Sequence, residues 1–397
     1  MKNYKKIMIM SDVLKHSDGI CYNTEWLYEI FKYIFSSYSD VEVFSLNKEN
    51  PTDFYHKFYE LIGVNEGDWF NLTTMGNNPN TLKLVEEKFK NCFIIAFELE
   101  PIIQKAFDEL KIPYIKMMNH PIRYLDDIFF GITSSEKDIF NKIKNYQVDA
   151  NLWKLKAAIM KAETARKDFC KEINIIPNSC VFFAQTNLDS SLLDKDKVVS
   201  FFDYKNRFME LYNQYDHLYY KIHPYQKNQD VIDFIKTLPK ASILWPNDIS
   251  AYDLLATDRV KKYVSISSGA LYEARYFGKD VEYFLHQPFM FVNDYKSEAE
   301  YNYKNTFVPV YKDYWQPSFW ADILKGYIEI TKTVPEDVDE PFHNTFRKII
   351  NMNWGYRDFS SVVVNREIPR IGEIFNRLKK KTKLHKLLHF YWLRGKK

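Results

Sequence analysis

The chain has 397 residues, a net charge of +3 at pH 7 and an ordinary charged fraction, so it is long enough for two globular domains. No apolar run approaches the roughly 20 residues that a helix needs to cross a bilayer. The short basic start is followed by a segment too brief for a secretory signal. The four cysteines lack zinc-site spacing and are expected to be free thiols in a reducing cytoplasm. These features argue against disordered, disulfide-stapled and membrane-spanning proteins.

Strand-like and helix-like segments alternate through the first half of the chain. Apolar runs of strand length lie at residues 6–11, 41–46, 91–99 and 113–118. Helical patterns follow at residues 23–35, 52–63 and 101–111, the last with Pro101 in its first turn, where proline is tolerated. Alternation of this kind predicts parallel strands joined by crossover helices.

A long helical stretch at residues 150–172 leads to an expected domain boundary near Pro177, after which the pattern restarts. Strands are predicted at 180–185, 217–222, 242–245, 262–267 and 281–286, with helices at 197–215, 228–238, 250–257 and 270–278. The prediction is therefore an α/β fold. Two doubly wound, Rossmann-like domains, residues 1–176 and 177–340, face each other across a cleft, and helices follow at residues 341–397.

Three strand ends of the second domain carry polar residues to one rim, because the carboxyl ends of parallel strands meet at one edge of a sheet. The segment "YYKIHPYQ" brings out Lys221, His223 and Pro224; "QTNLDSSL" brings out Gln185 and Asp189; and "SSG" supplies Ser267, Ser268 and Gly269. Each feature also has a plain structural explanation, because proline ends strands and serine often caps helices.

The "SSG" turn opens a helix and therefore offers backbone N–H groups and hydroxyls to an anion. Lys221 and His223 add positive charge beside it, so a phosphate ligand is predicted. Glu273, one turn into this helix, is a candidate acceptor for ribose hydroxyls, or else an ordinary helix-surface residue. No Walker-type loop and no GxGxxG motif is present, which argues against nucleoside triphosphates and dinucleotides.

The motifs "KIHP" and "SSG" resemble those of bacterial glycosyltransferases that use CMP-activated 2-keto sugars, the sialyltransferases and Kdo transferases. The segment "QTNLDSSL" is similar to the retaining β-Kdo transferases of capsule and O-antigen assembly, as are "FELEP" and "NHPIRYLDD". The resemblance extends in short motifs to about residue 290. It implies a GT-B-like fold and a CMP-β-Kdo donor held by Gln185, Lys221, His223, Pro224, Ser267, Ser268, Gly269 and Glu273.

The resemblance also implies transfer with retention through two displacements, with Asp189 as the nucleophile. Asp189 can instead be a helix cap. Glu98 is the candidate base and Glu100 its substitute, although either can cap the helix that begins at Pro101. His120 and Arg123 are candidates for holding the sugar carboxylate or the acceptor. The leaving group is a single phosphate ester that protonated His223, Lys221 and the serine turn can stabilise, so no metal or other cofactor is expected.

The end of the chain, residues 377–397, carries nine Lys or Arg and no acid, which leaves a net charge of −6 on the rest. Leu384, Leu387, Leu388 and Tyr391 recur at helical spacing, which predicts a basic amphipathic helix on an anionic membrane; a solvated tail is the alternative. The expected enzyme is cytoplasmic and peripheral on the inner face of the inner membrane. Its acceptor is a lipid-linked oligosaccharide, and no nucleic acid is expected as a partner.

Two other functions remain open from the sequence. An inverting CMP-sialic acid transferase would share the His-Pro and Ser-Ser motifs, but Asp189 would then be dispensable. A non-catalytic scaffold protein of glycan assembly would release no CMP from any donor.

Overall fold

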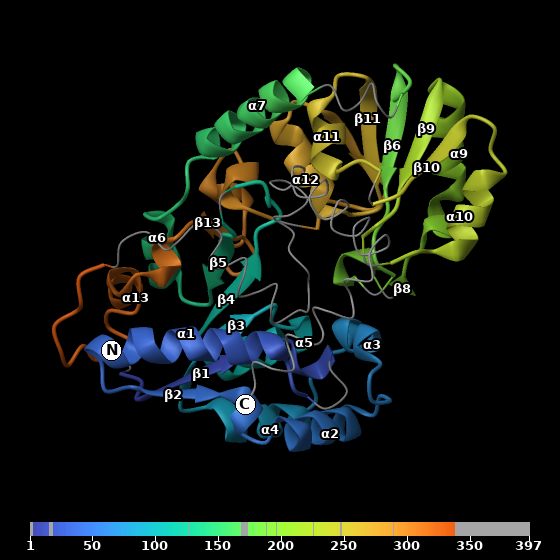
Figure 1. Cartoon of the computed structure of the whole chain (residues 1–397). Helices are drawn as coiled ribbons and strands as arrows, with labels where there is room; N and C mark the ends of the chain where they lie inside the picture. Colours follow the sequence, from blue (N-terminus) through green and yellow to red (C-terminus); the bar gives the residue numbers. More distant parts are fainter. Residues whose placement is uncertain are drawn as a thin grey trace, which may run out of the picture. The chain divides into compact units, whose positions relative to one another are not determined.

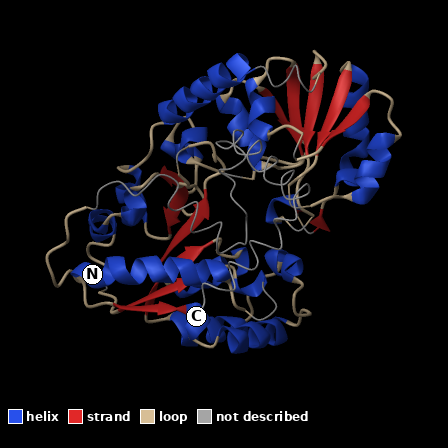
Figure 2. Ribbon diagram, in the orientation of Figure 1, coloured by secondary structure: helices blue, strands red, loops and turns tan. Residues whose placement is uncertain are grey.

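Two sheets with helices on their faces organise the chain in the computed structural model (Figures 1 and 2). The structure describes residues 3–15, 19–125, 127–167, 174–187, 189–195, 197–224, 226–246, 248–288 and 290–337. Residues 1–354 form one unit and residues 355–397 a second. The predicted helices at 341–397, the basic tail at 377–397 and Cys170 lie outside the described residues, whereas Cys21, Cys92 and Cys180 are buried and free, as predicted.

The first sheet has six strands in the order β13-β5-β4-β3-β1-β2. Its four predicted strands are β1 (Lys6–Met10), β2 (Glu42–Ser45), β3 (Cys92–Phe97) and β4 (Tyr114–Asn119), and they pair in parallel. β5 (Phe130–Ser134) and β13 (Val308–Val310) were not predicted, and both pair antiparallel. β5 can run antiparallel to β4 because the described residues that join the two strands form no crossover helix, which a parallel connection would need.

Alternate residues of the first sheet enter two separate cores, as expected for a sheet covered on both faces. Ile7, Ile9 and Ile95 pack in one core, and Met8 and Ile94 pack in the other. The covering helices are α1 (Tyr22–Tyr38), α2 (Pro51–Ile62), α3 (Trp69–Thr74), α4 (Pro79–Phe89), α5 (Pro101–Leu110) and α6 (Lys137–Lys144).

Helix α4 was not predicted, but it has a clear start signal. The Asn78 side chain accepts from the backbone N–H of Thr81 at 2.9 Å, and the Thr81 hydroxyl accepts from the backbone N–H of Asn78 at 2.9 Å. This reciprocal capping box satisfies two backbone donors that the helix itself leaves unpaired.

The second sheet confirms the predicted doubly wound fold. It holds β6 (Ser179–Phe183), β9 (His217–Lys221), β10 (Ala241–Leu244), β11 (Val260–Ser265) and β12 (Asp280–Tyr283), all parallel, in the order β10-β9-β6-β11-β12. Its helices are α7 (Ala150–Lys167), α9 (Lys205–Gln214), α10 (Gln229–Lys236), α11 (Ala251–Ala256) and α12 (Gly269–Tyr276). A small hairpin, β7 (Leu193–Asp194) and β8 (Lys197–Val198), follows the exit of β6.

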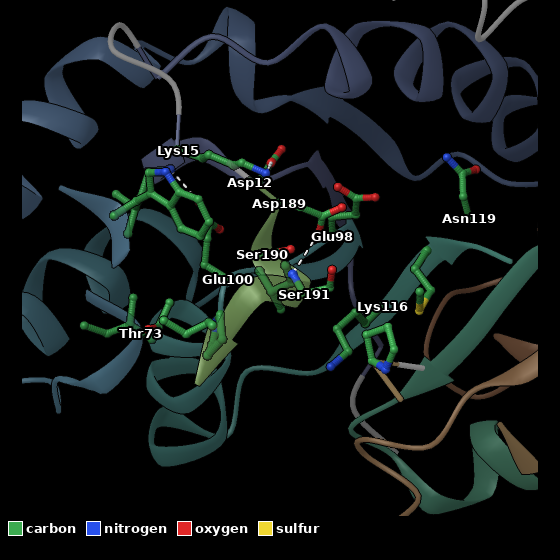
Figure 3. Close-up of a pocket in the computed structure, with 18 of the residues that line it drawn as sticks. Asp12, Lys15, Thr73, Glu98, Glu100, Lys116, Asn119, Asp189, Ser190 and Ser191 are labelled. Carbon is green, nitrogen blue, oxygen red and sulfur yellow. Dashed lines mark hydrogen bonds and ion pairs between the residues drawn. The ribbon is translucent and has the colours of Figure 1, made fainter. Parts of the chain in front are cut away.

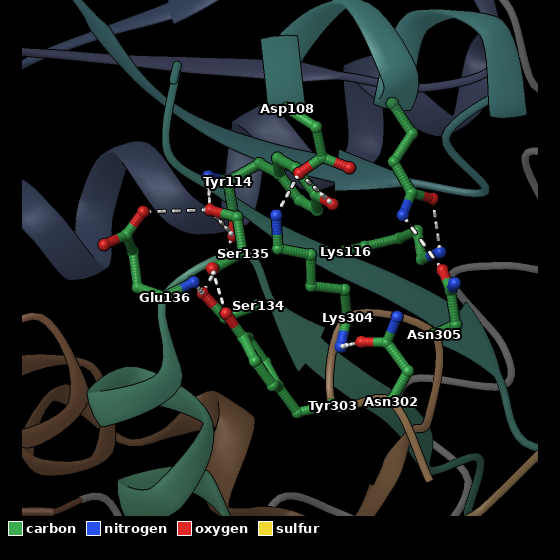
Figure 4. Close-up of polar contacts among 11 residues, drawn as sticks. Asp108, Tyr114, Lys116, Ser134, Ser135, Glu136, Asn302, Tyr303, Lys304 and Asn305 are labelled. Atoms are coloured by element: carbon green, nitrogen blue, oxygen red, sulfur yellow. Dashed lines mark hydrogen bonds and ion pairs between the residues drawn. The ribbon is translucent and has the colours of Figure 1, made fainter.

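After the second sheet the chain returns to the first. β13 joins its edge, and α13 (Pro317–Ile323) buries Phe319 and Trp320 in one of its cores. The loop before β13 is anchored by Lys304, whose Nζ lies 2.6 Å from Asp108, and by Asn305, which accepts from Gln104 at 3.0 Å (Figure 4). The predicted domain boundary near Pro177 did not foresee that β13 and α13 would return to the first sheet. Within the described residues, no helix has the length and apolar character needed to span a membrane.

Candidate active site

A pocket of about 620 Å³ in the unit formed by residues 1–354 is lined by loops that follow strands of both sheets. Its volume lies in the range of about 300 to 1,000 Å³ typical of ligand pockets. Four predicted site residues line it: Glu98, Glu100, Arg123 and Asp189. Figure 3 shows Glu98 and Glu100 with Asp12, Lys15, Lys116 and Asn119 of the first sheet, and Asp189, Ser190 and Ser191 of the second.

The strand orders explain why these loops come together. Counted along the chain, the parallel strands of the first sheet run 2-1-3-4, so its order reverses between β1 and β3. Those of the second run 3-2-1-4-5 and reverse between β6 and β11. Ligands of open α/β sheets bind at such reversal points, where the loops diverge to opposite faces. Asp12 and Glu98 follow β1 and β3, and Gln185 and Ser267 follow β6 and β11.

Glu98 leaves β3 with a left-handed backbone, φ 53°, which costs about 1 kcal/mol for a residue with a Cβ atom. Its backbone N–H still donates to Met117 O at 2.9 Å, so the strained residue is held in the sheet. The side chain lines the pocket and is exposed to solvent there. Nearby protein atoms still desolvate the carboxyl group, and together with the charges of Asp12 and Asp189 they raise the pKa of Glu98 to about 7.

Glu100 lies at the N-cap position of α5, but its side chain makes no capping bond there. Its Oε1 accepts from the backbone N–H of Leu14 at 2.5 Å, and its buried Oε2 has no partner among the described residues. Burial, and then the charge of Asp12, raises the pKa of Glu100 to about 8. Glu100 is therefore mostly a neutral carboxylic acid at pH 7.

Asp12 is buried, and its charge contributes to the raised pKa values of both Glu98 and Glu100. Its Oδ1 accepts from the Ser11 hydroxyl at 2.7 Å and from the Cys21 thiol at 3.2 Å, and Lys15 Nζ lies 3.9 Å from Oδ2. Among the described residues, no group of three or more acidic, histidine or cysteine side chains is placed to hold a metal ion.

Asp189 caps a short 3₁₀ helix, Ser190–Leu192, by accepting from the backbone N–H of Ser191 at 2.9 Å. The alternative predicted for Asp189, a cap, is therefore present. It does not conflict with a role as nucleophile, because the bond engages Oδ1 alone and the residue also lines the pocket. The charge of Asp189 acts on Glu98 of the other sheet and on His223.

Gln185 links the exits of β6 and β11. Its Oε1 accepts from the backbone N–H of Ser267 at 2.7 Å and from the Ser265 hydroxyl at 3.1 Å, and its Nε2 donates to the hydroxyls of Ser191 and Ser267. Ser268 caps α12 by accepting from Ala270 N at 3.3 Å, and Gly269 is the first residue of that helix. These polar groups are hydrogen-bonded to one another beside the pocket.

The sequence predicts Lys221 at the rim formed by the strand ends of the second sheet, but in the structure its side chain does not reach that rim. It is buried at the end of β9, and its Nζ donates to the Trp245 carbonyl at 2.7 Å, which ties β9 to the segment after β10. Burial lowers the pKa of Lys221 to about 8. The half-buried His223 also differs from the prediction, because desolvation lowers its pKa despite the opposing charge of Asp189, so the imidazole is mostly neutral at pH 7. Pro224 is exposed.

His120 and Glu273 are also placed differently from the prediction. His120 is fully buried, stacked on Phe129 at 4.1 Å between ring centroids, and burial holds its pKa well below the usual value. It belongs to the core and does not line the pocket. The buried Glu273 accepts from the backbone N–H of Arg123 at 2.6 Å and from the Tyr252 hydroxyl at 3.1 Å, so it holds the loop that carries Arg123.

The sequence assigns no individual role to Asp12, Lys15 or Lys116. The first two belong to the polar loop at residues 12–23, which its place after the first strand predicts to line the acceptor side, and both line the pocket. Lys116 lies within β4 and carries no such signal. Its Nζ donates to Gln104 at 2.7 Å, and Gln104 in turn contacts Asn305 (Figure 4). Burial lowers the pKa of Lys116 to about 8.

No protein-family model and no curated protein matches this sequence. One similar solved structure is Thermosulfurimonas dismutans KpsC, beta Kdo 2,7 transferase, which is 12% identical over 76% of this chain and 83% of that chain, with a TM-score of 0.36. Another, Thermosulfurimonas dismutans KpsC, beta Kdo 2,4 transferase, is 14% identical over 47% of this chain and 67% of that chain, with a TM-score of 0.29. A Neisseria meningitidis UDP-GlcNAc 2-epimerase is 10% identical over 70% and 82%, with a TM-score of 0.28. Similarity this distant leaves the activity to be argued from the residues.

Proposed function

We propose that this chain is a glycosyltransferase that moves Kdo from CMP-β-Kdo to a glycan acceptor with retention of configuration. The observation that carries the proposal is the meeting of Asp189 and Glu98 in one pocket, from loops of different sheets (Figure 3). Two carboxylates in unlike environments suit two roles, a nucleophile and a proton acceptor.

In the first displacement an Asp189 oxygen attacks the anomeric carbon of Kdo. The bond from that carbon to the phosphate oxygen breaks, and CMP leaves with the electron pair. Donors for the departing phosphate are the backbone N–H of Gly269, the first residue of α12, and the neutral imidazole of His223, which supplies one hydrogen bond. Gln185, Ser267 and Ser268 hold these donors in place through their mutual bonds.

In the second displacement the acceptor hydroxyl attacks the same carbon from the vacated face. Its proton passes to Glu98, and the ester bond to Asp189 breaks to regenerate the carboxylate. A pKa of about 7 suits a general base that works near neutral pH. Arg123 and Lys116 line the pocket and are candidates to offset the negative charge of the sugar carboxylate. The donor carries a single phosphate, so we propose that no metal is needed.

The test is CMP release by the purified protein with CMP-Kdo or CMP-sialic acid and a set of glycan acceptors. We expect release with CMP-Kdo and a trapped sugar adduct on the peptide that contains Asp189. Release from CMP-sialic acid without an adduct would instead indicate the inverting enzyme. No release from either donor by a protein that still binds CMP would indicate the scaffold.

We further propose that the acceptor is lipid-linked and that residues 377–397 hold the protein on the inner face of the inner membrane. Nine basic residues, each worth about 1 kcal/mol at an anionic surface, support reversible binding. Deleting this segment should weaken co-sedimentation with anionic vesicles but preserve turnover of a short soluble acceptor. Loss of turnover on the soluble acceptor would mean that the segment serves the fold or the site.

A further inference from the structure

His286 follows β12 and lines the pocket, although neither the sequence nor the proposed reaction gives it a role. Its side chain is exposed there, and within the described part of the chain no hydrogen bond or ion pair engages the imidazole. His223, the histidine that the sequence assigns to the donor phosphate, is not among the residues that line this pocket. Of the two histidines, the fold therefore presents His286 to the pocket.

The pairing of β12 with β11 decides where His286 lies. The two strands are parallel, and their ladder continues past the end of β12, because the backbone N–H of Leu285 donates to the Ile266 carbonyl at 3.1 Å. His286 is the next residue, so it leaves the sheet at the level of Ser268, the N-cap of α12. A phosphate bound to the backbone N–H of Gly269 would therefore have the imidazole at its side.

The exit of β6 reaches the start of α12 as well. Ser191 lines the pocket, and its hydroxyl lies 3.0 Å from the hydroxyl of Ser267. Asp189, the candidate nucleophile, belongs to the same short segment as Ser191 and lines the same pocket. The pocket therefore brings His286 to the segment that carries the candidate nucleophile.

Contacts on both sides of His286 restrict its backbone. Before it, the backbone N–H groups of residues 284 and 285 stay bonded to β11 and its extension. After it, the Gln287 side chain accepts from Arg275 of α12 and donates to Asp294 at 3.0 Å, and Arg275 lies 3.6 Å from Asp294. A side chain on a backbone held in this way loses less freedom when it binds a ligand. His286 is thus preorganised, while its ring N–H has no acceptor in the described chain.

We infer that His286 donates a hydrogen bond to the phosphate group of the donor, beside the backbone N–H of Gly269, and holds that phosphate as it departs. An imidazole ring donates in its neutral and in its charged form, so a phosphate oxygen suits either form. No proton moves in this step. The phosphate oxygen keeps the electron pair of the broken bond to the anomeric carbon, and the imidazole keeps its proton. The identity of the donor rests on the proposed function, but phosphate binding can be measured without turnover.

Calorimetry of full-length His286→Ala with CMP and with cytidine tests the inference. Loss of one hydrogen bond to a charged group should weaken CMP binding by about tenfold. The affinity for cytidine, which lacks the phosphate, should stay nearly unchanged. His56→Ala, at an exposed histidine that does not line the pocket, is the matched control. Melting temperatures of the same samples show whether each variant is folded.

His286→Gln, which keeps an N–H donor, should recover part of the CMP affinity. Unchanged CMP affinity in His286→Ala would overturn the inference. So would an equal loss for CMP and cytidine, because the imidazole would then contact the nucleoside.

The same measurements separate this inference from the proposed reaction. CMP binding that depends on His286, without turnover of any donor, would keep the inference and reject the reaction. Normal CMP release by His286→Ala with unchanged CMP affinity would keep the reaction and reject the inference. Absence of CMP binding by the unmodified protein would overturn both.

Discussion

The strand exits of the two sheets share a topological position but differ in charge. At the exits of the first sheet, Asp12, Glu98 and Glu100 line the pocket, and desolvation together with the charge of Asp12 raises the pKa of both glutamates. At the exits of the second sheet, Ser191 lines the pocket and is hydrogen-bonded to Gln185 and Ser267, which are not among its lining residues, and all three side chains are neutral. The first set of strand exits is therefore suited to holding and moving a proton, and the second to binding a ligand with fixed donors.

The difference shows that fold position alone does not define the chemistry of a strand exit. Both sets of strand exits lie where the strand order reverses. The two sets of strand exits differ in how their polar side chains interact. In the second sheet the side chains hydrogen-bond one another, whereas in the first sheet the carboxyl groups lie close together and their pKa values are raised. The variants below test this contrast.

The largest effect is expected at Asp189, a carboxylate that the second sheet contributes to the pocket. Asp189→Asn keeps the cap geometry but removes the nucleophile, so turnover should fall by about three orders of magnitude or more. CMP affinity, measured by calorimetry, should stay unchanged. Ser190→Ala, at an exposed neighbour, is the matched control. Near-normal turnover of Asp189→Asn would remove the covalent step from the mechanism.

Glu98→Gln should reduce turnover by about 10²- to 10⁴-fold, the usual contribution of a general base. In the unmodified protein the rate should rise with pH through about 7, as Glu98 loses its proton, and then level off. Glu98→Gln should lose that rise. Glu100→Gln is the matched control from the same loop. If that variant loses the pH dependence instead, the base is Glu100.

At the strand exits of the second sheet, His223→Ala and the double variant S267A/S268A should each weaken CMP binding by about tenfold, the value of one hydrogen bond to a charged group. Lys221→Met should differ from them, because Lys221 Nζ binds the Trp245 carbonyl. It should lower the melting temperature more than it lowers CMP affinity. Calorimetry and thermal unfolding on the same samples separate the two outcomes. A large loss of CMP affinity in Lys221→Met would return this lysine to the ligand site.

The smallest effect concerns stability. The pKa of Glu100 is raised from 4.5 to about 8 on folding, so its favourable contribution is complete below about pH 4.5 and is lost as pH rises through 8. The melting temperature of the unmodified protein should therefore fall between pH 5 and pH 8 relative to Glu100→Gln, by a few degrees. If the melting temperatures of the two proteins changed with pH in the same way across this range, the raised pKa of Glu100 would be contradicted.

Much of the fold could be predicted because its signals are local. The apolar runs of β1, β3, β6 and β9 and the helix that starts at Pro101 are readable from neighbouring residues alone. Strand exits then suggested Asp189 and Glu98, which the structure brings into one pocket. The antiparallel strands β5 and β13 could not be found in this way, because their direction depends on pairing with distant segments.

The sequence by itself determined which residues leave the carboxyl ends of the strands, because alternating apolar runs and helices define those ends locally. Only the tertiary structure decided what each residue does there. It buried His120 among aromatic rings and turned Lys221 toward Trp245. It also set Asp12 beside Glu98 and Glu100, which raised their pKa values. Burial and charge proximity arise from segments far apart in the chain, and no local pattern records them.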